Sequence, residues 1–363
     1  MKVLYVSSNG GIHDYRFLKK LVNDYEVLFL HYAAGEIIDE IDRLDNLQII
    51  SKRPAFRSMP LISERAHFRN VVKEFKPDII HTGYVWQVGI LAANSGFHPH
   101  LSMPWGSDIL TEPDKSYFRR KLVQKVMETC DHVQCDAEFV KQKIIRDYNK
   151  PEENITVFPW GIDLELFSRS DKAAARSSLK LDGDKFVILF NRYFEPVYGV
   201  NYLLDAYREF ASDKDDVMML MLSDGTGKND VLKFITEKGL DEKIQLIGRV
   251  PNHELPAFLN AADVYVSPSL SDGTSLSLLE AMACGTGLIV TDVPAIMEWV
   301  NNENGMIVEK GSAAGIKAAL EEYYINRELG NTHGAKNIQI AKERADWNKN
   351  YLKLKEIYAK LTK

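Results

Sequence analysis

The chain has 363 residues, which is long for a single hydrophobic core, so we expect two domains of about 150–200 residues each. Hydrophobic residues make up 45% of it and charged residues 26%, as in ordinary globular proteins, and no apolar run approaches the roughly 20 residues that span a bilayer. The formal net charge of −6 argues against nucleic acid as a partner.

The cysteines and the first residues bear on the compartment. Three cysteines, an odd number, follow no zinc-ligand spacing, and the N-terminal residues are typical of a strand rather than of a signal peptide. We therefore expect a cytoplasmic protein with reduced thiols, in which the cysteines are small buried residues: Cys130, Cys135 and Cys284.

Short runs rich in β-branched and aromatic residues alternate with helical patterns along the chain. Those of the first half predict strands at 2–7, 25–32, 47–51, 78–84, 100–105, 132–136 and 155–160. Those of the second half predict strands at 186–192, 217–223, 243–250, 264–269 and 287–292. Helical patterns lie between them, for example at 15–24, 199–213 and 229–239. This alternation indicates parallel sheets with helices on both faces.

The series of strands restarts near residue 185, after a polar, charge-mixed segment at 160–185 that is the best candidate for a linker. We therefore predict an α/β fold with two doubly wound, Rossmann-like domains that face each other across a cleft. In such sheets ligands bind at the carboxyl ends of the strands. We place the domains at 1–168 and 169–340, and expect the amphipathic segment 341–363 to pack back on the first domain as a helix.

The stretch "LSDGTSLSLLEAMACGTGLIVTDVP", residues 270–294, holds more polar groups than a helix start needs. We expect a helix to begin near Ser275 or Leu276, where unpaired amides and the helix dipole favour an anion. Gly273 lets the backbone approach a ligand closely. Asp272 would repel a phosphate, so it suits a hydroxyl-rich part of the ligand, and Glu280 suits a vicinal diol. A nucleotide diphosphate sugar has these features in this order.

A purely structural interpretation of the same stretch also exists. Ser277 and Glu280 have the spacing of a capping box, in which a serine and a glutamate satisfy the first amides of a helix. The stretch alone does not decide between a capped helix and a ligand site.

The wider sequence resembles family 4 of the retaining glycosyltransferases, which have the GT-B fold. "SDGTSLSLLEAMACGTGLIVTD" resembles the family's acid-x7-acid signature, with Asp272 in the place of the usual Glu. "ILFNRYFEPVYGVNYLLDAY" resembles its arginine-containing strand end, and "LIGRVPNHELPAFLNAADVYVSPS" its base-binding strand. "VFPWGIDLELF" resembles the interdomain junction and "SSNGG" the N-terminal glycine loop. The resemblance covers essentially the whole chain.

The resemblance implies an N-terminal acceptor-side domain, a C-terminal nucleotide-sugar domain and the roles of individual residues. Glu280 would bind the ribose, Asp272 the donor sugar, and Arg192 the diphosphate. Further contacts to the diphosphate would come from Gly10, Gly11 and the amides of Gly273, Thr274, Ser275 and Leu276. The base would meet the backbone of Gly248, Arg249 and Val250. The candidate catalytic residues are Asp272, Arg192 and Asp108.

Two departures from the family pattern stand out. The family commonly has a lysine just before the glycine of the arginine loop, where this chain has Tyr198 before Gly199, so a phosphate cation is missing or supplied elsewhere. Many members carry His-Gly-x-Asp in the first domain, and here the stretch begins with Trp105 and ends with Asp108. Asp108 is expected to hold a sugar hydroxyl or orient the acceptor, or else to be the N-cap of a helix.

Transfer in this family is drawn without a protein nucleophile, because the leaving diphosphate takes the acceptor proton on the face that it leaves. The protein then has to supply positioning and charge stabilisation. We expect a UDP-sugar as donor, since UDP donors are commonest in the family, and no metal. A cluster of carboxylates, "SDKDDV" at 212–217, is typical of a turn.

Two basic and aromatic stretches are candidates for the acceptor or for an anionic membrane: Lys52–Arg69 and Lys115–Lys121. Solvated helix faces have the same composition. They lead us to expect a glycan or lipid-linked acceptor, as in polysaccharide biosynthesis, and peripheral contact with the inner face of a membrane.

Three other functions remain open at this point. A dinucleotide-dependent dehydrogenase would need a third glycine in "LSDGTGKND", where Asp230 stands instead. A non-catalytic donor-binding or scaffold subunit would fit the departures at Tyr198 and Trp105. A sugar-nucleotide epimerase would share the fold.

Overall fold

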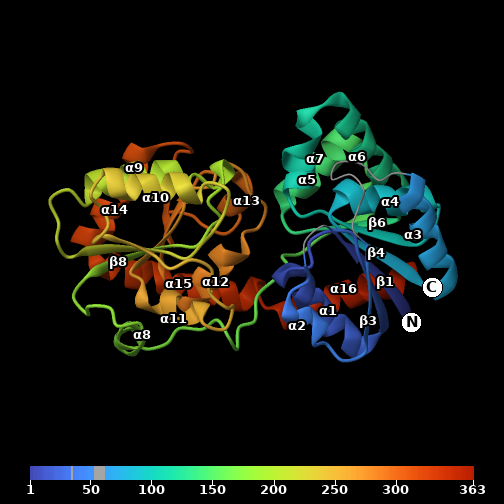
Figure 1. Cartoon of the computed structure of the whole chain (residues 1–363), viewed down its shortest axis with the longest axis horizontal. Coiled ribbons are helices and arrows are strands. Elements are labelled where there is room, and N and C mark those ends of the chain that lie inside the picture. The colour runs from blue at the N-terminus through green and yellow to red at the C-terminus, as the bar shows by residue number, and fades with distance from the viewer. Residues whose placement is uncertain (34–35, 53–61) are drawn as a thin grey trace. The chain divides into compact units, whose positions relative to one another are not determined.

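The structure is a computed structural model that describes residues 1–33, 36–52 and 62–363. It divides the chain into two compact units (Figure 1). Met1–Pro159 and Tyr351–Lys363 form the first, and Trp160–Asn350 form the second. Each is built on one parallel sheet with helices, which confirms the predicted pair of Rossmann-like domains.

The first unit contains a seven-stranded sheet in the order β3-β2-β1-β4-β5-β6-β7. The strands are β1 Lys2–Ser7, β2 Glu26–His31, β3 Leu47–Ser51, β4 Ile79–Gly83, β5 His100–Met103, β6 His132–Cys135 and β7 Ile155–Val157. The longer helices are α1 Ile12–Asp24, α3 Ile62–Phe75, α6 Tyr117–Thr129 and α7 Glu138–Tyr148. Shorter elements are α2 Asp39–Asp42, η1 Val85–Gly89, α4 Ile90–Ser95, α5 Ser107–Leu110, η2 Glu112–Lys115 and η3 Glu152–Asn154.

The second unit contains a six-stranded sheet in the order β10-β9-β8-β11-β12-β13. The strands are β8 Phe186–Phe190, β9 Val217–Met221, β10 Ile244–Leu246, β11 Val264–Ser267, β12 Gly287–Thr291 and β13 Met306–Val308. The longer helices are α9 Val200–Phe210, α10 Lys228–Glu237, α12 Leu276–Cys284, α14 Ala313–Ile325 and α15 Arg327–Arg344. Shorter elements are α8 Lys172–Ser178, η4 Pro196–Tyr198, α11 Leu255–Ala261 and α13 Pro294–Met297. The edge strand β13 was not predicted from the sequence.

The strand order places a switch point in each sheet. In the first unit β1 lies between β2 and β4, and in the second β8 lies between β9 and β11. On the two sides of the central strand the chain winds in opposite directions. The loop after the central strand and the loop after its neighbour on the other side of the switch point therefore diverge and leave room for a ligand. In the second unit these loops carry Arg192, after β8, and Asp272, after β11.

The last helix, α16 Trp347–Leu361, supplies residues to both units, and its residues from Tyr351 onward belong to the first. Within that unit the Tyr358 hydroxyl forms a 2.7 Å hydrogen bond with Nδ1 of His81, in the centre of the sheet. The Tyr351 hydroxyl donates to Asp24 at the end of α1. Both tyrosines are buried, so the end of the chain is part of the first unit's core.

The observed boundaries correct those expected at 168/169 and 340/341. The first boundary follows Pro159 and the second follows Asn350. The polar segment after Pro159 packs on the second unit, because the amide of Ile162 donates to the carbonyl of Ala345 at 2.8 Å and the Asn260 side chain donates to the carbonyl of Ser168 at 3.0 Å. This segment therefore belongs to the second unit rather than to a free linker.

Candidate active site

Helix α12 begins at Leu276, as the sequence predicted, and its N-cap is Ser275, whose hydroxyl accepts from the amide of Leu278. The capping-box interpretation is wrong, because Ser277 lies inside the helix and Glu280 lies beyond its first turn. The hydroxyl of Ser277 instead accepts from the Tyr265 hydroxyl at 3.0 Å. The polar residues at this helix start therefore do more than cap it.

Arg192 links the ends of β8 and β11. Its Nη1 donates to the hydroxyls of Ser275, at 2.5 Å, and Ser277, at 2.8 Å. Its Nη2 donates to the carboxylate of Asp272 at 2.6 Å. Only 11% of the Arg192 side chain and 15% of the Asp272 side chain are exposed, so the ion pair is largely shielded from water. The predicted acid, arginine and helix start thus form one cluster at the switch point.

The cluster is charged as well as buried. Burial is the largest single influence and lowers the pKa of Arg192, but Asp272, Tyr265, Tyr198 and Glu280 together outweigh it, and the pKa is raised. The guanidinium therefore stays cationic beside the amides at the start of α12. An oxyanion placed there meets a fixed cation and a helix N-terminus together.

Tyr198 occupies the position where the resemblance led us to expect a cation. Its ring lies over the guanidinium of Arg192, with Cζ 4.3 Å from the ring centroid. Burial raises the pKa of its hydroxyl, although Arg192 partly offsets this. Gly199 follows at φ +68°, and a Cβ there would lie 2.0 Å from the carbonyl oxygen of Pro268. The loop can therefore close on the end of β11 only with glycine.

The remaining predicted residues of the second unit fall in two places. Glu280 is 4% exposed on the second turn of α12, and the Thr274 hydroxyl accepts from the Trp299 indole at 3.3 Å. Gly248, Arg249 and Val250 follow β10, which is two strands away from β8. The hydrogen bonds of the cluster thus unite Arg192 and Asp272 with the start of α12, while residues 248–250 lie at another strand end.

In the first unit the glycine loop after β1 is held by a buried carboxylate. Asp14 accepts from the hydroxyls of Tyr5 and Ser7 and from the amide of Gly10. Burial raises the pKa of Asp14 to about 6, although these hydrogen bonds oppose the rise. Gly10 has φ +68°, and a Cβ there would lie 3.0 Å from Nε2 of His31. The expected contact of Gly10 and Gly11 with a diphosphate stays a prediction.

The carboxylate of Asp108 likewise accepts hydrogen bonds from backbone amides. It lies inside α5, whose N-cap is Gly106, so the alternative in which Asp108 caps a helix is wrong. Its carboxylate accepts from the amides of Val85, at 2.7 Å, and Trp105, at 2.9 Å. Burial raises its pKa to about 6, although these hydrogen bonds lower it. Asp108 thus fixes the loops after β4 and β5 to each other, and its predicted contact with a substrate stays a prediction.

Trp105 lies where the family resemblance led us to expect a histidine, and it belongs to an aromatic cluster that the sequence did not reveal. Its ring makes edge contacts with His13, at 5.5 Å between centroids, and with Tyr84, at 6.2 Å. Tyr84 has φ +86°, which is rare for a residue with a side chain.

The acidic and basic stretches have local partners. Within the described residues no group of three or more His, Cys, Asp or Glu side chains is placed to hold a metal ion. In the segment 212–217 Asp213 pairs with Lys214, Asp215 with Lys243, and Asp216 with Arg327. The three cysteines are buried thiols: Cys130, Cys135 and Cys284.

Of the two basic stretches, residues 53–61 of Lys52–Arg69 lie outside the described residues. In Lys115–Lys121, Lys115 and Arg119 both pair with Glu112, while Tyr117 is 77% and Phe118 55% exposed. In the part of the chain that the structure describes, no helix combines the length and the apolar character needed to cross a membrane.

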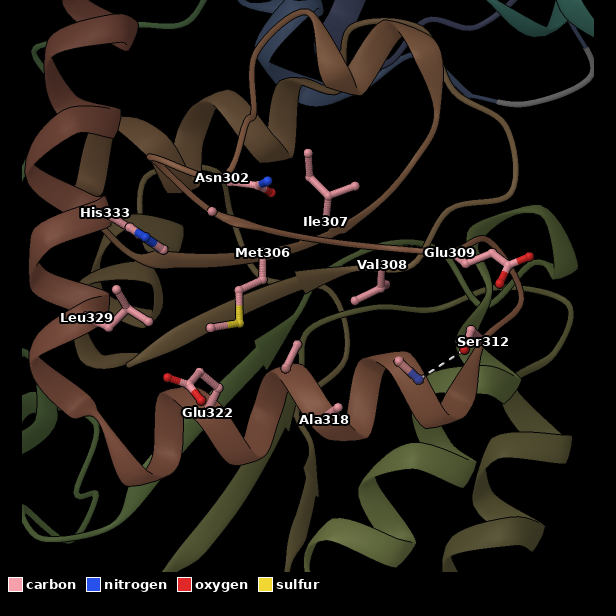
Figure 2. A pocket seen from close by; sticks show the side chains of 13 residues that line it. Asn302, Met306, Ile307, Val308, Glu309, Ser312, Ala318, Glu322, Leu329 and His333 are labelled. Atoms are coloured by element: carbon pink, nitrogen blue, oxygen red, sulfur yellow. Dashed lines mark hydrogen bonds between the residues drawn. The ribbon is translucent and has the colours of Figure 1, made fainter.

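A separate groove of about 700 Å³ runs along the edge strand β13 and helix α14 (Figure 2). Met306 and Val308 of the strand and Ala318 of the helix line its middle, and His333 of α15 lies at one end. None of the predicted site residues lines it, so it is distinct from the Arg192 cluster.

Two family models match the chain. The one described as Glycosyltransferase Family 4 matches residues 12–166, and the one described as Glycosyl transferases group 1 matches residues 171–350. An uncharacterized glycosyltransferase of Methanocaldococcus jannaschii is 26% identical over 375 residues, covering 100% of this chain and 98% of that protein. A D-inositol 3-phosphate glycosyltransferase of Thermobispora bispora is 25% identical over 352 residues, covering 92% of this chain and 80% of that protein.

Solved structures have the same fold. The UDP complex of Anabaena HepE matches with a TM-score of 0.82 and 18% identity, covering 99% of this chain and 100% of that one. The sucrose-phosphate synthase of Thermosynechococcus elongatus matches with the same TM-score and identity, covering 99% of both chains. With one family model on each half and glycosyltransferases among its relatives, the chain is a glycosyltransferase of the family 4 type.

Proposed function

We propose that this glycosyltransferase moves a sugar from a UDP-sugar to a hydroxyl of a glycan or lipid-linked acceptor, with retention at the anomeric carbon. The observation that carries the proposal is the cluster at the switch point of the second sheet. There the fork of Arg192 meets the start of α12 beside the carboxylate of Asp272. HepE, which has the same fold, is known in complex with UDP and with UDP-glucose, which supports UDP as the carrier.

The proposed chemistry is same-face transfer. The bond between the anomeric carbon and the diphosphate oxygen breaks, UDP leaves, and the acceptor oxygen bonds to the carbon. The acceptor proton passes to the leaving diphosphate oxygen. Negative charge develops on the diphosphate, so Arg192 and the amides of 273–276 stabilise the transition state more than the ground state.

The two acids of the proposed acid-x7-acid motif have different tasks. Asp272 accepts hydrogen bonds from sugar hydroxyls, in exchange for part of its pairing with Arg192. Glu280, buried on α12, accepts from the ribose diol. We further propose that the base meets the backbone of 248–250 and that no metal takes part, since the diphosphate charge is met by Arg192 and the helix start.

We also propose that the acceptor is presented at an anionic membrane, on the cytoplasmic side, as in polysaccharide biosynthesis. The support is the exposure of two adjacent aromatic side chains, Tyr117 and Phe118, beside the cations of 119–121. Aromatic rings with neighbouring cations are favoured at the interface of anionic lipids. Sedimentation with anionic and with neutral vesicles tests this contact, and equal binding to both would contradict it.

The donor is tested with UDP-, GDP- and ADP-sugars in two assays. A nucleotide sugar that binds the folded protein raises its unfolding midpoint, and slow hydrolysis of the donor releases a free nucleotide diphosphate. Proton NMR of the first-formed sugar product gives the anomeric configuration. Stabilisation and turnover with UDP-sugars and a retained configuration would support the proposal. Binding without any turnover would favour a non-catalytic subunit, and an inverted product would exclude retention.

A further inference from the structure

The ring of Tyr198 packs on the one cation of the proposed diphosphate site. We propose that Tyr198 is a positioning residue for Arg192: its ring holds the guanidinium in the plane in which Nη1 reaches the start of α12 and Nη2 reaches Asp272. In this chain stacking thus replaces a second cation. The inference rests on the proposed function, because it concerns the residue that would bind the diphosphate.

The contacts of Arg192 leave its guanidinium little freedom. One face lies against the ring of Tyr198, 4.3 Å from Cζ to the centroid. The edge bearing Nη1 and Nη2 donates to two serine hydroxyls and to Asp272. A planar guanidinium that is held by one face and by one edge has a defined orientation, which a lysine ammonium cannot have.

These contacts do not involve Nε. Nε of Arg192 is buried and has no hydrogen-bond partner among residues 1–33, 36–52 and 62–363. A buried N–H without an acceptor is unfavourable, so an oxygen that reaches it gains a charge-assisted hydrogen bond. The same stack that orients the fork therefore also orients a donor that is free for a phosphate oxygen.

The fold sets the position of the ring. The amide of Tyr198 donates to the carbonyl of Glu195 at 2.9 Å, closing the short turn η4. Glu195 in turn accepts from the amide and the hydroxyl of Thr226. The amide of Leu270 donates to the carbonyl of Val197, which joins the loop to the end of β11. Tyr198 is thus fixed by backbone contacts on both sides before any ligand binds.

The charge of the site explains why an aromatic ring can take the place of a second cation at position 198. Arg192 is already paired with Asp272, and a lysine at 198 would place a second cation against the guanidinium face. Like charges at that distance repel, whereas the negative face of an aromatic ring attracts the guanidinium. We therefore expect Tyr198→Lys to loosen Arg192 rather than to restore a stronger phosphate site.

The first test needs no ligand. In ¹⁵N-labelled protein the Nε–H signal of Arg192, assigned by its loss in Arg192→Lys, should be sharp and slow to exchange. Tyr198→Phe keeps the ring and should keep this signal, whereas Tyr198→Leu should broaden it or speed its exchange about tenfold or more. Tyr193→Leu, an exposed residue in the same loop, is the matched control and should leave the signal unchanged. An unchanged signal in Tyr198→Leu overturns the inference.

The second test uses UDP as the probe, with calorimetry on four proteins. A cation–π contact in a shielded site corresponds to roughly a 3- to 30-fold change in affinity, so Tyr198→Leu should weaken UDP about tenfold. In an Arg192→Ala background the same substitution should change affinity less than twofold, because its effect passes through Arg192. Equal losses in both backgrounds overturn the inference. If the parent binds no UDP, the proposed donor is wrong, and the Nε–H signal still decides the role of Tyr198.

Discussion

The carboxylates in the loops at the strand ends have different partners in the two units. In the first unit Asp14 and Asp108 are fully buried and accept from backbone amides, so they hold the loops after β1, β4 and β5. In the second unit Asp272 is paired with a cation, and that cation also binds the start of a helix. The comparison indicates that the first unit's acids shape its loops, whereas the second unit's acid is paired with a cation at a helix start, where we propose that a charged ligand binds.

The largest expected effect comes from removing the cation of the second unit. Arg192→Ala should lower kcat for transfer or donor hydrolysis roughly 10²–10³-fold, the cost of losing one preorganised donor where charge develops. UDP release in a coupled assay measures it. Arg208→Ala, on the exposed side of α9, is the control and should keep parental turnover. Near-parental turnover in Arg192→Ala would mean that another cation holds the diphosphate.

The next prediction concerns acid, which should affect the first unit more. Burial lowers the pKa of His81 and His100 to about 3 and that of His132 to about 4. Between these values and 6.5 the unfolded chain binds more protons at these positions, so stability falls as pH falls, by up to about 1.4 kcal/mol per pH unit for each histidine.

The buried acids oppose this effect. Asp14 and Asp108 titrate near 6 in the folded unit, so between about 4 and 6 the folded state holds their protons and gains stability as pH falls. Burial also lowers the pKa of His31 and of His67 in this unit, so more histidines than carboxylates contribute and the first unit loses stability as pH falls. Hydrogen exchange at pH 5 and pH 7, corrected for intrinsic rates, should show that the amides of β4–β6 lose more protection at pH 5 than the amides of β8–β12 do. His81→Gln should reduce the difference, and identical protection at both pH values would contradict it.

The twelve strands predicted from sequence are all present, because most are apolar runs buried on both faces and bounded by polar loops. The edge strand β3 is present although its residues are only partly buried or exposed. The strand that was missed, β13, has only three residues and follows the polar stretch "NNENG", so it shows no periodicity. The domain boundaries were misplaced by about ten residues, because whether a polar segment packs depends on distant partners such as Ala345, which accepts from Ile162, and Asn260, which donates to Ser168.

That Arg192, Asp272 and the start of α12 lie together was predictable from the sequence, but their individual contacts were not. Arg192 and Asp272 stand after strands that the sequence identified, and parallel pairing of β8 with β11 brings them together. The role of Ser277 was missed because serine three residues before glutamate also fits a helix start. The orientation of Tyr198 depends on η4 and on the positive φ of Gly199, and neither can be derived from residue types alone.

A smaller effect is expected from the second acid of the second unit. If Glu280 accepts from the ribose diol, Glu280→Ala removes charge-assisted hydrogen bonds of roughly 1.5–3 kcal/mol, so UDP affinity should fall about tenfold or more while the fold is kept. Calorimetry with UDP measures it. Glu322→Ala, exposed on α14, is the matched control. An unchanged affinity in Glu280→Ala would leave this residue a structural role in α12 and limit the ligand site to Arg192 and Asp272.

The smallest expected effect is that of removing divalent metal. The carboxylates of Asp14 and Asp108 accept from amides and hydroxyls, and Asp272 is paired with Arg192, so each already has donors that a metal ion would have to displace. In the proposed donor complex the diphosphate charge is met instead by a guanidinium and by the amides of a helix start, which bind anions without a metal. Turnover after dialysis against EDTA should therefore stay within about twofold of the untreated protein, a difference of roughly 0.4 kcal/mol in activation free energy. Loss of turnover on chelation, restored by Mg²⁺ or Mn²⁺, would show that an acid of one of the two units exchanges its present partner for a metal in the donor complex.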